Sequence, residues 1–199
     1  MNPVAKGPKR KKHETTQIMT ARIHEELVML LPRLRRFARG LTGSAEDADD
    51  LVQAACERAI TRLHQWQPGT RLDSWMYRII QTIRLDQLRA HGVRQRHLEA
   101  VQMEQEEHPA NGDTEMETNL TLDRVRAAME RLPEEQRAVL MLICVEGYSY
   151  REAAEVVGAP IGTVTSRLTR ARVALERMLE NGEQTGRQAR LEGLDHAAL

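Results

Sequence analysis

The chain has 199 residues, and its 29 Lys and Arg residues balance 29 Asp and Glu residues, so the formal net charge is zero. Its two cysteines, Cys56 and Cys144, have no Cys or His neighbours at metal-ligand spacing, which excludes a disulfide scaffold and a zinc knuckle. No apolar run approaches the roughly 20 residues of a membrane span, so we expect a soluble, cytoplasmic protein without membrane insertion.

Charge is placed unevenly along the chain although it sums to zero. A basic stretch opens the chain, and residues 1–22 lack hydrophobic periodicity, so we expect a disordered basic tail there. Residues 95–119 also lack periodicity, and they carry seven acidic residues between Glu99 and Glu117 without any Lys or Arg. We expect this segment to be a flexible acidic linker. The net charge therefore does not exclude a nucleic-acid partner.

Three amphipathic helices are predicted before the linker. Apolar residues recur every three or four positions over 27–41, the spacing that places side chains on one helix face. Ser44 suits the N-cap of a second helix, whose first turn is acidic and so complements the helix dipole. A loop over 64–70 contains Pro and Gly, and a third helix runs from Leu72 to about Ala90.

The third helix presents arginines opposite its apolar stripe. Arg71, Arg78 and Arg89 lie seven and eleven residues apart, which brings them within roughly 20° of one another on a helix. Trp75 shares the apolar stripe and Tyr77 lies close to it, so core packing is the better interpretation for both rings. Trp66 lies in the preceding loop and is the better candidate for stacking on an unstacked base.

A second helical unit is predicted over residues 120–180. Pro133 suits the first turn of one of its helices. Residues 150–157, a turn at 158–162 and a helix over 163–179 have the outline of a helix-turn-helix. No strand signal appears anywhere, so the predicted fold class is all-α.

The final predicted helix has two distinct faces. Val164, Leu168, Ala171 and Leu175 fall within about 40° of one another and form a buried stripe. The opposite face carries Ser166, Thr169, Arg170 and Arg177. Arginines and hydroxyls on an outward face can read base edges in a major groove, although an ordinary surface helix has similar composition.

Three sequence segments carry a family resemblance. The run LPEEQRAVLMLICVEGYSYREAAEVVGAPIGTVTSRLTRARVAL is similar to region 4 of extracytoplasmic-function (ECF) sigma factors of the bacterial sigma-70 family. DADDLVQ and LDSWMYRIIQTIRLDQLR resemble the polymerase-binding and promoter-melting segments of region 2. The resemblance covers roughly residues 27–180. It implies two small helical domains, region 2 at 23–94 and region 4 at 120–180, joined by the linker and followed by a C-terminal tail at 181–199.

The resemblance also implies the role of individual residues. The minus 35 promoter element would be read by region 4 through Thr163, Thr165, Ser166, Arg167, Thr169, Arg170 and Arg172. The minus 10 element would be bound and melted by Trp66, Arg71, Arg78, Arg84 and Arg89. Core polymerase would contact Asp47, Asp50, Leu51 and Gln53.

The implied partners are core RNA polymerase, through its beta-prime clamp and beta flap, promoter DNA and an anti-sigma factor. The implied function is promoter-specific transcription initiation in a stress or environmental response. We expect neither a catalytic site nor a metal or cofactor, because no phosphate-binding loop or partnered nucleophile is recognisable. The chain is therefore not predicted to be an enzyme.

Two other functions remain compatible with the sequence. A sigma-like decoy would bind an anti-sigma factor without touching DNA, but it would not need the arginine-rich face of the last helix. A dimeric helix-turn-helix regulator would not need the DADDLVQ and SWMYRII segments.

Overall fold

A computed structural model describes the backbone of residues 8–67, 69–99 and 118–195, and the side chains of 22–67, 69–92 and 122–180. Every element within these ranges is helical, which confirms the all-α prediction. The elements are α1 (Pro8–Thr42), α2 (Ala45–Thr61), the 3-10 turn η1 (Leu63–Gln65), α3 (Leu72–Glu99), α4 (Thr118–Glu130), α5 (Glu134–Leu140), the π-helical η2 (Met141–Val145), α6 (Tyr150–Val157) and α7 (Ile161–Asp195). In these ranges no helix combines the length and apolar character that crossing a bilayer demands.

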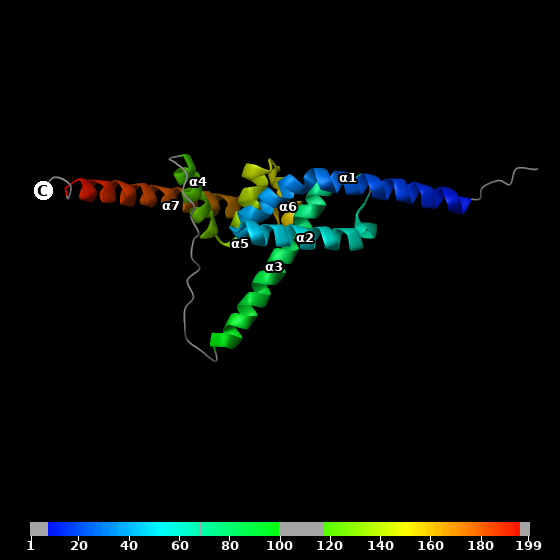
Figure 1. Ribbon diagram of the computed structural model, residues 1–199, viewed down its shortest axis with the longest axis horizontal. Helices are drawn as coiled ribbons and strands as arrows, with labels where there is room; N and C mark the ends of the chain where they lie inside the picture. Colours follow the sequence, from blue (N-terminus) through cyan, green and yellow to red (C-terminus); the bar gives the residue numbers. More distant parts are fainter. Residues whose placement is uncertain (1–7, 68, 100–117, 196–199) are drawn as a thin grey trace, which may run out of the picture.

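Helices α1, α2 and α3 form the first module. Figure 1 shows α1 and α2 running side by side, with α3 crossing them. Phe37 from α1, Leu51 from α2 and Ile80 from α3 are fully or almost fully buried where the helices meet. The Ser44 hydroxyl accepts a hydrogen bond from the Asp47 amide at 3.3 Å, which confirms the predicted N-cap of α2.

Helices α4 to α7 form the second module. The apolar stripe of α7 confirms the predicted helical spacing, since Val164, Leu168 and Ala171 are buried. It packs against α4, α5 and α6. Between α6 and α7 the chain turns at Gly158, whose φ of 65° lies in the left-handed region that glycine adopts without strain.

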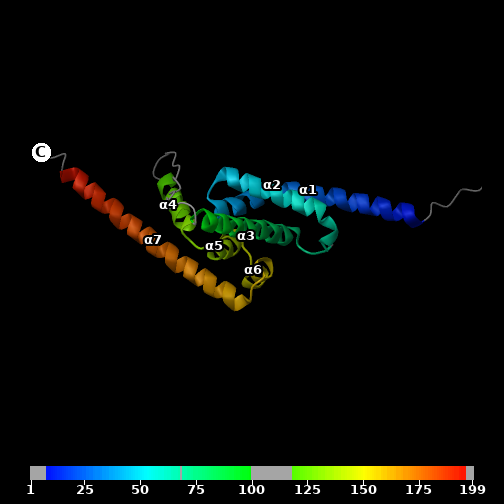
Figure 2. The same ribbon diagram turned by 90° about the horizontal axis from the view of Figure 1, so that it is seen from below.

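The two modules share one continuous hydrophobic core. Its buried residues run from Ile23 in α1 to Ala171 in α7, and α3 and α1 contact α6 and α5 directly. Figure 2 shows α3, α5 and α6 lying between the α1–α2 pair and α7. The described helices therefore pack as a closed arrangement in which the second module covers one side of the first.

Three helix ends differ from the predicted boundaries. Helix α1 begins at Pro8, within the predicted disordered tail, and no proline or glycine interrupts residues 9–31. Helix α7 continues to Asp195, because the glycines of its last turns each cost only about 1 kcal/mol against a run of good helix formers. Helix α3 extends to Glu99, and the rest of the predicted linker, 100–117, lies outside the described residues.

Candidate nucleic-acid interface

The outward face of α7 carries exposed polar side chains on a rigid support. Thr165, Thr169 and Arg170 are exposed, and the buried stripe on the opposite side fixes the helix against its module. The hydroxyl of Thr165 donates to the Ile161 carbonyl at 3.0 Å, and that of Thr169 to the Thr165 carbonyl at 3.0 Å. Both hydroxyl groups keep acceptor capacity, so the face remains free to receive a new polar partner.

Other predicted residues of α7 are partly engaged. The hydroxyl of Ser166 donates to the carbonyl of Thr163 at 3.0 Å and accepts from Arg170 at 3.3 Å. These contacts remain within α7, where they hold the arginine along the helix surface. Exchange of the 3.3 Å contact for a base or phosphate would cost little, because the guanidinium is already exposed.

Two arginines at the edge of this face have partners in the rest of the module. Arg167 forms an ion pair with Glu135 of α5, and only 20% of its side chain is exposed, so it joins α5 to α7. Arg172 is exposed and donates to the Cys144 sulfur at 3.6 Å. Arg172 is thus better placed than Arg167 to meet a phosphate.

The orientation of α6 is set by a capping box. The Ser149 hydroxyl accepts from the Glu152 amide at 3.3 Å, and the Glu152 carboxylate accepts from the Ser149 amide at 2.8 Å. Hydrogen bonds from Ser149 lower the pKa of Glu152, so this carboxylate stays ionised. The same carboxylate also forms an ion pair with Arg71 of the first module.

The predicted polymerase-binding residues of α2 divide into two groups. Asp47, Asp50 and Gln53 are exposed along one surface of the helix. Leu51 is 1% exposed and packs in the core, so its assignment to the polymerase surface is wrong. A helix places residues one position apart about 100° from each other, so Leu51 faces inward when Asp50 faces outward.

The four predicted DNA-binding arginines of the first module have different environments. Arg78 and Arg89 are exposed, and Arg89 pairs with Asp86 on the same helix at 3.5 Å. Arg84 pairs with Glu134 of α5, and Arg71 pairs with Glu152 of α6. The second module therefore forms ion pairs with two of these four arginines.

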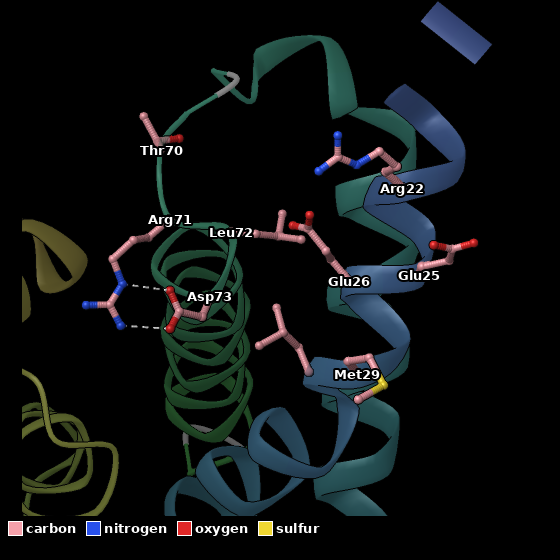
Figure 3. A pocket seen from close by; sticks show the side chains of 9 residues that line it. Arg22, Glu25, Glu26, Met29, Thr70, Arg71, Leu72 and Asp73 are labelled. Carbon is pink, nitrogen blue, oxygen red and sulfur yellow. Dashed lines mark hydrogen bonds and ion pairs between the residues drawn. The ribbon is translucent and has the colours of Figure 1, made fainter. Parts of the chain in front are cut away.

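Arg71 is the most heavily engaged of these side chains. It donates to both Asp73 carboxylate oxygens, at 2.8 and 3.1 Å, as Figure 3 shows. Its guanidinium carbon also lies 4.6 Å from the ring centroid of Tyr148. The hydrogen bond to Asp73 raises the pKa of Arg71 further above its usual range. Burial opposes ionisation of Asp73, but the hydrogen bonds from Arg71, Tyr148 and the Ser74 amide and the charge of Arg71 together outweigh it, so the pKa of Asp73 is lowered.

The aromatic side chains confirm one prediction and leave another open. Tyr77 is fully buried, as predicted, and its hydroxyl donates to Glu146 at 2.7 Å. Burial, reinforced by that hydrogen bond, raises the pKa of Tyr77 far above its usual value. Trp75 and Trp66 both pack partly against the core, and the buried indole nitrogen of Trp66 meets no hydrogen-bond partner among the described residues. Its role in base contact stays a prediction.

A hollow of about 670 Å³ lies between α1 and the start of α3. Figure 3 shows Arg22 and Glu26 of α1 on the side of the helix that faces the segment from Thr70 to Asp73, whereas the Glu25 side chain points away from it. The lining mixes arginines with carboxylates, so it has no clear preference for an anion. Sequence reasoning did not associate α1 with this segment, because the contact depends on tertiary packing alone.

Glu146 is the main polar residue that sequence reasoning missed. Its carboxylate is fully buried and lies at the C-terminal end of η2. A negative charge at a helix C-terminus is opposed by the helix dipole, so this position is locally unfavourable and signals a partner from elsewhere in the chain. Among the residues described, no group of three or more potential ligands could hold a metal ion.

Known proteins provide close matches to both modules. Residues 122–175 match the family "Sigma-70, region 4", and residues 27–81 match the family "Sigma2 domain of PhyR". The chain is 32% identical over 161 residues to the ECF RNA polymerase sigma factor EcfG of Rhodopseudomonas palustris. That alignment covers 81% of this chain and 87% of its relative.

Solved structures give the same picture. The sigma factor RpoE, crystallised with the anti-sigma factor NepR from Bartonella quintana, matches with a TM-score of 0.65 and 32% identity, covering 79% of this chain and 96% of that one. The anti-anti-sigma factor PhyR of the same organism, also complexed with NepR, matches with a TM-score of 0.52 and 20% identity. The match covers 77% of this chain and 49% of PhyR, and it concerns the fold alone.

Proposed function

Because this chain belongs to the ECF family of RNA polymerase sigma factors, we propose that it binds core RNA polymerase and directs promoter-specific transcription initiation. The observation that carries the proposal is the outward face of α7, where Thr165, Thr169 and Arg170 are exposed above a buried apolar stripe. An exposed arginine on a supported helix can donate two hydrogen bonds to guanine in the major groove. The polymerase supplies the chemistry, and this chain supplies recognition.

We assign the two promoter elements to different modules. Region 4 reads the minus 35 element through α7, with Arg172 available for a backbone phosphate. Region 2 binds the minus 10 element through the arginines of α3, and Trp66 stacks on an unpaired base, which contributes about 1–3 kcal/mol. This stacking offsets part of the cost of opening the duplex.

The polymerase contacts follow the exposed surface of α2. The carboxylates of Asp47 and Asp50 and the amide of Gln53 are all exposed. Their exposure supports the assignment of these residues to the beta-prime clamp. The second module is assigned to the beta flap. An anti-sigma factor is a further proposed partner, supported by the likeness to RpoE, whose crystal structure contains the anti-sigma factor NepR. These assignments imply a cytoplasmic protein of a stress response.

Run-off transcription with purified core polymerase tests the proposal. The chain should direct initiation at discrete start sites on genomic promoter fragments, and core polymerase alone should not. A sigma-like decoy or a dimeric operator-binding regulator would give no chain-dependent transcripts. Co-purification of the Asp50→Ala variant with core polymerase should be weakened relative to Asp49→Ala, a neighbouring exposed carboxylate that pairs with Arg35 on α1. Equal binding of both variants would reject the clamp assignment.

A further inference from the structure

Every lysine of the chain lies between residues 6 and 12, and all other Lys or Arg positions are arginines. Three of these lysines and one arginine form the basic run, which consists of Lys9, Arg10, Lys11 and Lys12. Glu14 is the only acidic residue between this run and Glu25. The whole chain has a formal net charge of zero, so this concentration of positive charge is a local feature.

The basic run occupies the first turn of α1, where positive charge is unfavourable. The amino-terminal end of a helix carries a partial positive charge, which repels cations and stabilises anions. Helices α2, α3, α5 and α6 each have an acidic residue in the first turn, and α4 and α7 begin with uncharged residues. The basic run therefore does not stabilise its own helix, and an anionic partner would relieve the repulsion.

The backbone of α1 carries the basic run beyond the rest of the first module. Figures 1 and 2 both show the N-terminal part of α1 projecting past α2, α3 and the loop between them. This loop and the start of α3 contain Trp66 and Arg71, which are assigned to the minus 10 element. Arg22, further along α1, lies on the side of the helix that faces the segment from Thr70 to Asp73 (Figure 3).

Helix geometry gives the reach of this projection. The basic run precedes Arg22 by 10 to 13 residues of uninterrupted helix. At about 1.5 Å per residue, this is a distance of about 15–20 Å. Because B-DNA advances by about 3.4 Å per base pair, the distance corresponds to about five base pairs. DNA that continues past the minus 10 element is therefore within reach of the basic run.

The composition of the basic run suits phosphates better than bases. The lysine ammonium group is a compact charge on a flexible stem, whereas arginine has the planar fork that pairs with two acceptors at once. Consecutive helix positions are about 100° apart, so the four cationic positions surround the helix axis and do not define one face. Base reading needs a defined face, but attraction to the phosphate backbone does not.

We propose that the N-terminal part of α1 is a phosphate arm, which holds the DNA backbone flanking the minus 10 element. The proposal rests on the proposed function in one respect, the location of the minus 10 element on the first module. The phosphate arm contributes affinity without selecting a sequence. Each phosphate that it neutralises releases counterions, so its contribution is large at low salt and small at high salt.

The first experiment measures the salt dependence of promoter binding. The variant Lys9→Gln/Lys11→Gln/Lys12→Gln removes three charges and keeps a good helix former at each position. Fluorescence anisotropy with core polymerase and a labelled promoter duplex should give a slope of log affinity against log salt that is shallower by about 2. Each lost phosphate contact changes the slope by about 1, and three lysines around a helix do not all face DNA at once. Affinity at low salt should fall at least about tenfold, and equally on promoters of different sequence.

The matched control is Arg39→Gln/Arg126→Gln/Arg131→Gln, which removes three exposed cations from other surfaces and should keep a slope close to that of wild type. The variant Lys9→Arg/Lys11→Arg/Lys12→Arg preserves the charge and should do the same. An unchanged slope in the lysine-to-glutamine variant would overturn the proposal. A loss confined to one promoter sequence, or an equal change in the control, would also overturn it.

The second experiment locates the contact, since amine-selective acetylation modifies lysines and the lysines of this chain are confined to one end. Holoenzyme is treated with sulfo-NHS acetate with and without promoter DNA, and peptides of the chain are quantified by mass spectrometry. Promoter DNA should lower acetylation of Lys9, Lys11 and Lys12 several-fold relative to the holoenzyme alone. The same protection by core polymerase without DNA would assign the basic run to a polymerase surface and overturn the proposal.

The salt titration is also made with the free chain and a mixed-sequence duplex, where it does not require sigma activity. A chain that directs no transcription with core polymerase, but shows a shallower slope in the lysine-to-glutamine variant, would refute the proposed function and retain the phosphate arm. Normal transcription combined with an unchanged slope would refute the phosphate arm and leave sigma activity intact.

Discussion

The two predicted DNA-binding surfaces contrast in their availability. On α7, the hydrogen bonds that Arg170 and the neighbouring hydroxyls make with described residues stay within the helix, so the predicted minus 35 surface is open in the packed chain. On the first module, Arg71 and Arg84 are engaged by glutamates of the second. Residue type is the same in both places, and the difference arises from which side of each module the other one covers. In the described residues the second module therefore covers part of one predicted surface and leaves the other open.

A cavity in the second module tests whether the modules form one cooperative unit. Leu168 is almost fully buried in α7, so Leu168→Ala should lower the free energy of unfolding by about 3 kcal/mol. Both tryptophans of the chain, Trp66 and Trp75, belong to the first module. The midpoint of the urea transition that their fluorescence reports should therefore fall, although the substitution lies in the other module.

The control for this measurement is Leu122→Ala, because Leu122 is exposed on α4 and should cost little. A tryptophan transition that stays at its wild-type midpoint in Leu168→Ala would mean that the modules unfold independently. The contrast drawn between the two surfaces would then lose its structural basis.

Loss of an arginine from the open surface should affect promoter binding. Arg170→Ala should weaken binding of the holoenzyme to promoter DNA by about 1–3 kcal/mol, or roughly fivefold to more than a hundredfold. Association with core polymerase should persist. Arg126→Ala, which removes an exposed arginine from α4, is the charge-matched control. Gel-shift and pull-down assays check this, and equal losses in both would reject the assignment of Arg170.

Loss of the capping box should destabilise α6 and weaken the contact between Glu152 and Arg71. Ser149→Ala should lower the free energy of unfolding by about 1 kcal/mol, because the Glu152 amide loses its cap. Glu152 would also lose the Ser149 hydroxyl as a donor, and only the backbone amide of residue 149 would still orient it towards Arg71. Thermal unfolding measures the cost, and Ser149→Thr should restore most of it. If Ser149→Thr were as unstable as Ser149→Ala, capping would not be the cause.

Acid should lower the free energy of unfolding through Asp73, and this effect should be smaller than those of the substitutions above. The pKa of Asp73 is lowered from its ordinary value of 3.8 in the folded chain, so its contribution to stability is present above that value. That contribution is lost as the pH falls through 3.8 and below. Urea unfolding between pH 6 and pH 3 should therefore show a shallower loss in Asp73→Asn than in wild type. Asp49→Asn removes an exposed pair with Arg35 and should follow the wild-type slope closely.

Local patterns were sufficient to predict most of the fold. The spacing of Val164, Leu168 and Ala171 identified the buried side of α7, and Ser44 identified the start of α2. Such signals depend on neighbours within one or two turns, so a single sequence contains them. Leu51 is the exception within the site, since a motif matched as a block does not separate its inward residue from its outward ones.

The packing of the modules against each other could not be read from the sequence. Glu146 and its donors Arg33 and Tyr77 are separated by 113 and 69 positions, and no periodicity connects them. The acidic segment between the modules instead suggested separate domains. Only the unfavourable position of Glu146 at a helix C-terminus pointed to a distant partner.

The most direct test is the distribution of distances between the two modules in the free chain. Spin labels at Met29→Cys and Val173→Cys, exposed positions on α1 and α7, should give a narrow distribution in a chain that also carries Cys56→Ser and Cys144→Ser. A broad distribution would contradict the packing of the second module against the first.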